Sequence, residues 1–431
     1  MRRICHRTRA AGEATASPDP ARTLAPLSGL PTRKAARDLL DATLEQRKPL
    51  EDALEHLPKR LDPRDRAAAH RIAAMVLRRL GCIDEVLSPF LRRDPPPPAR
   101  HALRIGTAEL LLLDTPAHAA VATAVALAPK AFAGLVNAVL RKVATEGAAA
   151  LEGLDAPRLD TPQWLWSAWH AAYGPAVRAI AEAHRGPAPL DLTPAPGATP
   201  PEGADILPTG SWRFAAGTRV TDLPGFAEGR FWVQDAAAAL PARLLKPRPG
   251  ERIADLCAAP GGKTAQLAAA GAEVTAVERD AGRVARLTEN LARLRLPAEI
   301  IRADAAAWTP AAPFDAILLD APCTATGTIR RHPDVAHAKR PRDVPAAAEA
   351  QARLLAAAAR MLKPGGRIVF ATCSLQPEEG EAHLARAAAL GLAHDPFSPA
   401  ELPGLPEAIT PAGCLRTRPD FWGERGGMDG F

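Results

Sequence analysis

Three features are missing from this 431-residue sequence, and each absence argues against a class of protein. There is no run of about 18 uncharged apolar residues, which a membrane-spanning helix needs, so we expect no membrane span. The first residues contain no apolar stretch of the kind that a secretory signal carries. The six cysteines include no Cys-x-x-Cys pair, so neither a disulfide framework nor a metal site is expected. We therefore expect a cytoplasmic protein that binds no metal ion.

The residues that are present indicate a globular protein of several domains. Apolar residues make up 47% of the chain and charged residues 24%, which is typical of folded proteins. The length suits two or three domains. The net charge of +6 fits a polyanionic partner such as RNA, although an arginine-rich composition alone gives the same surplus. We expect a monomer.

The N-terminal part of the chain shows helical periodicity. Residues 1–30 hold several arginines followed by Pro, Ser and Thr, and we expect a disordered leader there. Residues 31–150 show no strand-like alternation, so we expect an all-α bundle. Apolar residues recur at helical spacing in four segments, namely 36–44, 71–80, 101–113 and 130–143.

Residues 155–240 have a different character. Trp164, Trp166 and Trp169 lie close together, and such a cluster either stacks on nucleic-acid bases or packs a helix against its neighbour. Packing is the interpretation that we favour. Pro and Gly are frequent further on, with strand candidates such as 190–193. We expect a small α+β module that links two larger domains.

Residues 241–431 alternate short apolar strands with helical stretches. This alternation is typical of a doubly wound parallel sheet, so we expect an α/β domain with a Rossmann-like fold. The expected strands are 252–256, 273–278, 298–301, 315–320 and 367–371.

The first of these strands runs into a glycine-rich turn. Gly261 and Gly262 permit a tight turn and a close approach of the backbone to a nucleotide. The spacing is neither that of a Walker loop nor G-x-G-x-x-G. Glu278 ends the next strand and can accept hydrogen bonds from ribose hydroxyls, and Asp304 after the third strand can bind an adenine amino group. Because ligands bind beyond the carboxyl ends of such strands, these residues predict a nucleotide site.

Two cysteines follow the ends of the last two expected strands. Cys323 lies in DAPCTATG and Cys373 in ATCSLQPEE. Methylation of cytosine at carbon 5 is a reaction that needs two such groups. A thiolate adds to carbon 6 and makes carbon 5 nucleophilic toward a methyl donor, and a second group assists release of the product from the thiol. The thiolate requires a pKa below its usual value of about 8.5. Candidate sources of the positive charge that would lower it are Lys263, Arg330 and Arg331. Spacing alone leaves open which cysteine attacks.

Three motifs closely resemble those of the RNA cytosine-5 methyltransferases: DLCAAPGGKT, DAPCTATG with RRHPD, and ATCSLQPEE. Two N-terminal segments, ALRIGTAELLLL and GLVNAVLRKV, resemble NusB, and residues 220–240 also resemble these methyltransferases. A NusB-like domain ahead of such a methyltransferase is similar to the Sun or RsmB family, which modifies 16S ribosomal RNA in bacteria. The resemblance covers roughly residues 30–431.

This resemblance implies a methyl donor and a role for each site residue. Cys373 is the nucleophile, Cys323 takes part in product release, and Asp320 contacts the cytosine. The implied RNA contacts are Arg330, Arg331 and His332, together with the NusB-like domain. The implied S-adenosylmethionine site consists of Cys257, Ala258, Ala259, Pro260, Gly261, Gly262, Lys263, Glu278, Asp304 and Asp320.

The chain departs from the family pattern in three places. Glu278 stands where many relatives have Asp, and residues 189–194 replace an Arg-Val-Asn run, which puts RNA contacts of that module in doubt. The sequence ends at GGMDGF, where relatives continue into a last apolar strand inside the sheet. We therefore expect that the final strand is shortened or that its role is filled differently, and that the C-terminal segment is frayed.

Two alternatives stay open at this point. The same catalytic motifs would serve a cytosine-5 methyltransferase that acts on transfer RNA or another RNA. A different class is a NusB-like RNA-binding factor whose methyltransferase half is vestigial. The intact Cys373, Cys323 and glycine turn argue against that second alternative.

Overall fold

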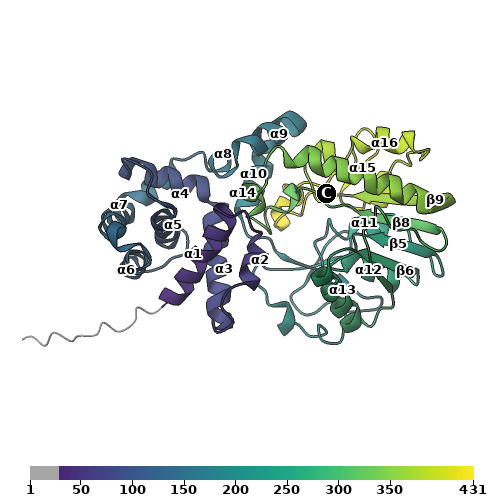
Figure 1. The fold of residues 1–431 in the computed structure, drawn as a ribbon, viewed down its shortest axis with the longest axis horizontal. Helices are drawn as coiled ribbons and strands as arrows, with labels where there is room; N and C mark the ends of the chain where they lie inside the picture. The colour runs from purple at the N-terminus through teal and green to yellow at the C-terminus, as the bar shows by residue number, and fades with distance from the viewer. Residues whose placement is uncertain (1–28) are drawn as a thin grey trace, which may run out of the picture.

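The computed structural model describes residues 29–431, so the expected leader lies almost entirely outside the described residues. Helices form one half of the molecule, and a parallel sheet with its covering helices forms the other half (Figure 1). Between residues 29 and 431, no helix has the length and apolar character that crossing a membrane requires.

The N-terminal half is the expected all-α bundle. Its four longest helices each begin or end within a few residues of a segment with apolar periodicity. Asp62 caps one of them, since its side chain accepts a hydrogen bond from the backbone N–H of Arg64 at 2.7 Å. Leu39, Leu103 and Leu140 are fully buried in its core. The helices of this half are α1 (Leu30–Leu44), α2 (Leu50–Glu55), α3 (Pro63–Arg78), α4 (Leu80–Leu87), α5 (Pro97–Leu111), α6 (Ala117–Leu127) and α7 (Ala133–Glu152).

Three further helices link the bundle to the rest of the chain. They are α8 (Ala156–Asp160), α9 (Gln163–Tyr173) and α10 (Val177–Arg185). Trp169 is buried in α9, and its ring meets the edge of the His184 ring at a centroid distance of 5.3 Å. Trp164 and Trp166 pack against the same cluster. The tryptophans therefore pack helices together, as we expected.

A small antiparallel sheet follows, with the strand order β2-β3-β1-β4. One expected strand, 190–193, corresponds to β1. Leu192, Trp212 and Phe231 are buried together on this sheet. Its strands are β1 (Leu190–Pro194), β2 (Asp205–Ile206), β3 (Trp212–Phe214) and β4 (Phe231–Val233).

The second sheet is parallel and has the order β7-β6-β5-β8-β9. Two of its strands have the bounds expected from the sequence, and the other three overlap the expected segments. The order reverses at β5, so a crevice for ligands is expected at the carboxyl ends of β5 and its neighbours. The strands are β5 (Arg252–Leu256), β6 (Glu273–Glu278), β7 (Glu299–Arg302), β8 (Phe314–Asp320) and β9 (Leu362–Ala371).

Helices cover both faces of this sheet, which is the expected Rossmann-like arrangement. The long helix α15 packs on one face through Leu354, Leu355 and Met361, whereas α13 packs on the other through Leu287 and Leu291. The helices of this half are α11 (Leu240–Leu244), α12 (Gly262–Ala269), α13 (Ala281–Leu294), α14 (Val335–Ala338), α15 (Asp343–Met361) and α16 (His383–Ala389).

The C-terminal segment is packed, so the expectation of a frayed end was wrong. Met428 and Asp429 are buried. The backbone N–H of Gly430 donates to the carbonyl oxygen of Gly327 at 2.8 Å. No strand follows β9 in the sheet within residues 29–431. The last residues lie instead against the loop that follows β8.

Charge holds the C-terminal segment in place. Arg330 and Arg331, which follow β8, pair with Asp235 and Asp429, and we call these four residues the arginine–aspartate cluster. The Nε atom of Arg330 lies 2.8 Å from Asp429, and its Nη2 atom lies 3.0 Å from Asp235. Burial raises the pKa of Asp235, but Arg331 and Arg330 outweigh it and hold that pKa below its usual range.

This cluster corrects the expectation that Arg330 and Arg331 contact RNA. Arg330 is 1% exposed, and its guanidinium donates to Asp235, Asp429 and the carbonyl oxygen of Gly426. Arg331 donates to the same two aspartates and to the carbonyl oxygen of Pro189. Arg330 is therefore a buried structural residue, and Arg331, whose side chain is 21% exposed, is held by the same two aspartates.

Asp191 extends the charged region into the small sheet. It lies in the segment that replaces the Arg-Val-Asn run, and Arg213 on β3 binds both of its carboxylate oxygens at 2.7 Å. Arg331 lies 3.8 Å from the same aspartate. Three arginines therefore face three aspartates, so the buried charges balance.

The helical half is docked on residues 326–339, the segment that carries RRHPD. The backbone N–H of Leu50 donates to the carboxylate of Asp334 at 3.2 Å. The Nε2 atom of His337 lies 2.8 Å from the carbonyl oxygen of Leu77. Both contacts use the backbone of the helical half, so they fix its position relative to the parallel sheet.

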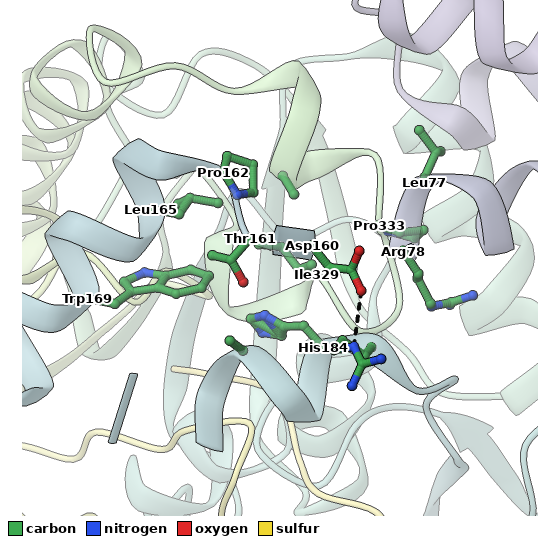
Figure 2. Close-up of a pocket in the computed structure, with 13 residues that line it drawn as sticks. Leu77, Arg78, Asp160, Thr161, Pro162, Leu165, Trp169, His184, Ile329 and Pro333 are labelled. Carbon is green, nitrogen blue, oxygen red and sulfur yellow. Dashed lines mark hydrogen bonds and ion pairs between the residues drawn. The ribbon is translucent and has the colours of Figure 1, made fainter. Parts of the chain in front are cut away.

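A small cavity lies at this junction (Figure 2). Arg78 reaches it from the helical half, Trp169 and His184 from the linking helices, and Ile329 from the loop after β8. Its volume of about 20 Å³ is far below that of a ligand pocket, and none of the expected catalytic residues lines it. Arg78 also donates to the carbonyl oxygen of Arg330 at 3.0 Å. The cavity is therefore a packing junction.

Replacing Asp235 should destabilise the protein. In Asp235→Asn the two buried guanidiniums lose one of their two carboxylates, so the free energy of unfolding should fall by about 3 kcal/mol. Urea denaturation at neutral pH measures this change. The matched control is Asp222→Asn, an exposed residue that pairs loosely with Arg219, which should change stability by less than about 1 kcal/mol. Equal midpoints for the two variants would contradict the importance of the cluster.

Candidate active site

The glycine turn after β5 has the geometry that the sequence predicts. Gly261 has φ 101°, a left-handed conformation that side chains rarely adopt. A Cβ atom at this position would also lie 2.5 Å from a methyl group of Leu287. The next residue, Gly262, begins α12. Backbone therefore approaches the crevice closely here, as a nucleotide site requires.

Residues 257–263 follow the carboxyl end of β5. Burial, together with the nearby carboxylates of Asp320 and Glu278, raises the pKa of the Cys257 thiol to about 12. Ala258 and Ala259 are buried beside it. This stretch and the ends of β6 and β8 therefore converge on one place.

Glu278 at the end of β6 has a free acceptor. Its Oε1 atom accepts hydrogen bonds from the backbone N–H groups of Arg279 and Asp280, at 2.9 and 3.1 Å. Its Oε2 atom is buried and accepts no hydrogen bond from residues 29–431, although Arg283 lies 3.3 Å away. A buried carboxylate oxygen of this kind fits a ligand hydroxyl, so the residue suits a ribose.

Two more acids lie at the same edge of the sheet. Asp304 after β7 is exposed, and one of its oxygens accepts a hydrogen bond from the backbone N–H of Ala306 at 2.9 Å. Asp255 on β5 is fully buried and accepts a hydrogen bond from the Thr264 hydroxyl at 2.6 Å. Burial raises the pKa of Asp255 to about 7. Its buried position supports the turn, whereas Asp304 is open to a ligand.

Lys263 and Asp320 join the turn to the end of β8. The Lys263 ammonium lies 2.7 Å from the Asp320 carboxylate, and the lysine is buried. Burial alone would lower the pKa of Lys263, but Asp320 outweighs it and the pKa is raised. The lysine therefore stays charged beside the catalytic motifs.

The two cysteines meet at this point. β8 and β9 are neighbours in register, with Asp320 opposite Ala371, so the loops after both strands leave the sheet together. The Sγ atoms of Cys323 and Cys373 lie 3.4 Å apart. The two thiols therefore lie in contact at the carboxyl edge of the parallel sheet, where ligands of such folds bind.

The electrostatics of Cys373 differ from our expectation. The hydrogen bond with Cys323 and burial both raise the pKa of Cys373 well above its usual value. Lys263 opposes this rise. Arg330 and Arg331, which we expected to lower the pKa, are bound in the arginine–aspartate cluster instead. That expectation was wrong because neighbouring carboxylates neutralise both guanidiniums.

Two residues near this centre were not predicted from the sequence. The ring of Phe431 lies 5.1 Å from the Lys263 ammonium, in a segment that we expected to fray. Glu379, within the quoted motif ATCSLQPEE, is fully buried behind the loops that carry both cysteines. The remaining expected RNA contact, His332, is exposed. The burial or exposure of Phe431, Glu379 and His332 depends on how the loops pack, which the sequence does not reveal.

Fold and site together define a class of enzyme. A parallel sheet with this strand order, a glycine turn after β5 and acidic residues at the following strand ends is the architecture of an S-adenosylmethionine-dependent methyltransferase.

Comparison with known proteins is more specific. Residues 242–392 match the family model described as 16S rRNA methyltransferase RsmB/F, and residues 30–145 match that of the NusB family. Ribosomal RNA small subunit methyltransferase B of Xanthomonas campestris pv. campestris is 38% identical over 386 residues, which cover 83% of this chain and 87% of the relative. The same-named protein of Klebsiella pneumoniae subsp. pneumoniae is 36% identical over 415 residues, covering 87% and 95%. The chain therefore belongs to the RsmB family of ribosomal RNA methyltransferases.

Solved structures have the same fold. The crystal structure of PH0851 covers 93% of this chain and 97% of its own, with a TM-score of 0.67 and 22% identity. A methyltransferase homologue from Pyrococcus horikoshii covers 61% and 91%, with a TM-score of 0.50 and 27% identity. The first similarity extends over both halves of the molecule.

Loss of the Glu278 carboxylate should weaken binding of S-adenosylmethionine. Glu278→Ala removes an acceptor for the ribose, and a hydrogen bond to a charged group contributes about 1.5–3 kcal/mol, which corresponds to a roughly tenfold to hundredfold higher Kd. Isothermal titration calorimetry measures the affinity. Glu273→Ala, at the exposed start of the same strand, is the control and should bind like the wild type. Unchanged affinity in Glu278→Ala would exclude Glu278 from the site.

Proposed function

We propose that this protein methylates carbon 5 of a cytosine in 16S ribosomal RNA through a covalent adduct with Cys373. The observation that supports this most is the contact of the two thiols, 3.4 Å apart, beside the pair of Lys263 and Asp320. Methyl transfer to a nitrogen or an oxygen does not require two thiols, whereas methylation of carbon 5 needs one nucleophile and one group that assists release.

The proposed reaction assigns one role to each side chain. Cys373 passes its proton to solvent, its thiolate sulfur adds to carbon 6, and ring nitrogen 3 takes up a proton, which leaves a neutral enamine with a nucleophilic carbon 5. Asp320 accepts a hydrogen bond from the cytosine and stabilises the positive charge that develops on the ring. Bound S-adenosylmethionine would supply an electrophilic methyl group to carbon 5 and would leave as S-adenosylhomocysteine. Cys323, as a thiolate, then accepts the carbon 5 proton, the double bond between carbons 5 and 6 re-forms, and Cys373 leaves as a thiolate while nitrogen 3 returns its proton to solvent.

The proposed cofactor site combines the turn and the strand ends. The Glu278 carboxylate accepts hydrogen bonds from the ribose, and Asp304 binds the adenine amino group. Lys263 stays charged and limits the rise in the pKa of Cys373. The remaining members of the proposed site are Cys257, Ala258, Ala259, Pro260, Gly261, Gly262 and Asp320.

The proposed division of labour follows the domains expected from the sequence. Residues 31–150 bind the RNA, residues 155–240 link the two larger domains, and residues 241–431 carry out methylation. The protein is proposed to act as a monomer. His332 is exposed on the segment that carries RRHPD and is proposed to contact the RNA. The target base leaves its stack to reach the thiols, as base-modifying enzymes require. The RNA substrate is proposed to be 16S ribosomal RNA because the curated relatives are named for small-subunit RNA.

Single cysteine variants test the covalent route. Cys373→Ala should abolish methylation of ribosomal RNA while S-adenosylmethionine still binds. Cys323→Ala should accumulate a protein–RNA adduct that withstands denaturing electrophoresis, because addition proceeds and release fails. Cys414→Ala changes a thiol outside this centre and should behave like the wild type.

The outcomes also separate the alternatives. An adduct with Cys373→Ala, and none with Cys323→Ala, would reverse the two roles. Methylation of transfer RNA in preference to ribosomal RNA would favour the other substrate class. RNA binding without any methylation by the wild type would favour a vestigial enzyme. Bisulfite sequencing of ribosomal RNA from a deletion strain would identify the modified cytosine.

The rate of adduct formation should increase with pH. Because the pKa of Cys373 is raised, the thiol is protonated at neutral pH, and its thiolate fraction grows about tenfold for each pH unit. Rapid-quench measurements with RNA that contains 5-fluorocytosine, between about pH 6.5 and 8.5, follow this step. A rate that is flat over that interval would contradict a protonated resting thiol.

A further inference from the structure

One buried carboxylate connects the loops of both cysteines. The residue after Cys323 is Thr324, and the residue after Cys373 is Ser374. The Glu379 carboxylate accepts hydrogen bonds from the backbone N–H of Thr324 at 2.8 Å, from the Thr324 hydroxyl, and from the Ser374 hydroxyl at 2.5 Å. All three residues are at most 1% exposed. The same acceptor therefore holds the neighbour of each thiol.

This carboxylate has no cationic partner among residues 29–431. Its fourth donor is the Gln351 amide, at 3.2 Å. Gln351 also donates to the carbonyl oxygen of Pro322 at 3.0 Å, and its amide oxygen lies 2.9 Å from the Nε2 atom of His383. Burying a carboxylate without a positive partner is costly unless hydrogen bonds replace its hydration. An apolar residue at this position would support the loops without that cost, so the charge calls for a specific explanation.

We infer that Glu379 is a positioning residue that sets the distance between the thiols of Cys323 and Cys373. This inference rests on the proposed function, because it concerns the geometry of the proposed addition and elimination. The two loops come from different strands, and the hydroxyls of Thr324 and Ser374 lie 3.1 Å apart between them. A shared acceptor with several lone pairs fixes both loops at once, which a neutral side chain of the same shape cannot do.

The required accuracy is high. Both thiols must reach the same pyrimidine ring, one at carbon 6 and the other near carbon 5. Displacement of a reacting group by about 1 Å can reduce a rate by about a hundredfold. A carboxylate that touches neither substrate nor cofactor can therefore affect methylation strongly by holding these two loops.

Glu379→Gln is the direct test. Both hydroxyls donate to Oε2, whereas Oε1 accepts from the backbone N–H of Thr324 and from the Gln351 amide. The amide keeps only one acceptor atom, so an NH2 group that replaces Oε1 faces these two donors and the loop after Cys323 loses its anchor. The single-turnover rate of methylation should fall by about a hundredfold, while the Kd values for RNA and for S-adenosylmethionine stay within about twofold. Glu378→Gln is the matched control, since Glu378 is the exposed neighbour in the same motif and should leave the rate unchanged.

A second readout measures the thiol geometry without any methylation. Diamide oxidises the two thiols to a disulfide and takes up both hydrogens at its N=N bond. The wild type should form the Cys323–Cys373 disulfide rapidly, as detected by peptide mass spectrometry. Glu379→Gln should form it at least tenfold more slowly, whereas Glu378→Gln should match the wild type. A purely structural role would lower thermal stability without this selective effect on the thiol pair.

Hydroxyl variants keep the test valid if Glu379→Gln does not fold. Thr324→Ser retains the hydroxyl and should retain the rates of methylation and disulfide formation, whereas Thr324→Val and Ser374→Ala should lower both. Wild-type rates in Glu379→Gln, or in both Thr324→Val and Ser374→Ala, would overturn the positioning role. Methylation by Cys373→Ala would instead overturn the proposed function, and the diamide rates would still report on Glu379.

Discussion

The arginine–aspartate cluster joins three distant parts of the chain. Arg330 and Arg331 belong to the loop after β8, Asp235 to the segment after the small sheet, and Asp429 to the C-terminal residues. The loop after β8 also carries Cys323, and the C-terminal residues place Phe431 near Lys263. The loop that carries Cys323 is therefore anchored by a balance of buried charges. Such a cluster tolerates loss of one partner poorly, because the other charge stays buried.

Much of the architecture was predictable from local patterns. The strands at 252–256 and 273–278 have the predicted bounds because each is a short segment rich in apolar residues that begins two residues after a glycine in a left-handed conformation. β9 begins at Leu362, five residues before the predicted strand, because Leu362 pairs with Phe314 of β8 and the residues between it and Arg367 form an irregularity in the register. Pairing of this kind depends on the neighbouring strand, so periodicity within the segment does not reveal it.

The local backbone geometry near the candidate site was predictable from the sequence, whereas the partners of its charged side chains were not. The glycine turn and the convergence of Cys323 and Cys373 follow from the order of strands and loops. The fate of Arg330 depends on Asp235 and Asp429, which are 95 and 99 residues away along the chain. An arginine that binds phosphate and an arginine that binds two buried aspartates look the same in a sequence. The same limit applies to Glu379, whose neighbour Glu378 is the same residue type on the surface.

The docking of the helical half has a consequence for substrate choice. Backbone groups of Leu50 and Leu77 bind the segment that carries Asp334 and His337, which leaves little freedom for one half to swing against the other. When the helical half binds RNA as proposed, the distance between the bound RNA element and the thiol pair is constant. The enzyme then selects a cytosine by its distance from that RNA element as much as by the neighbouring bases.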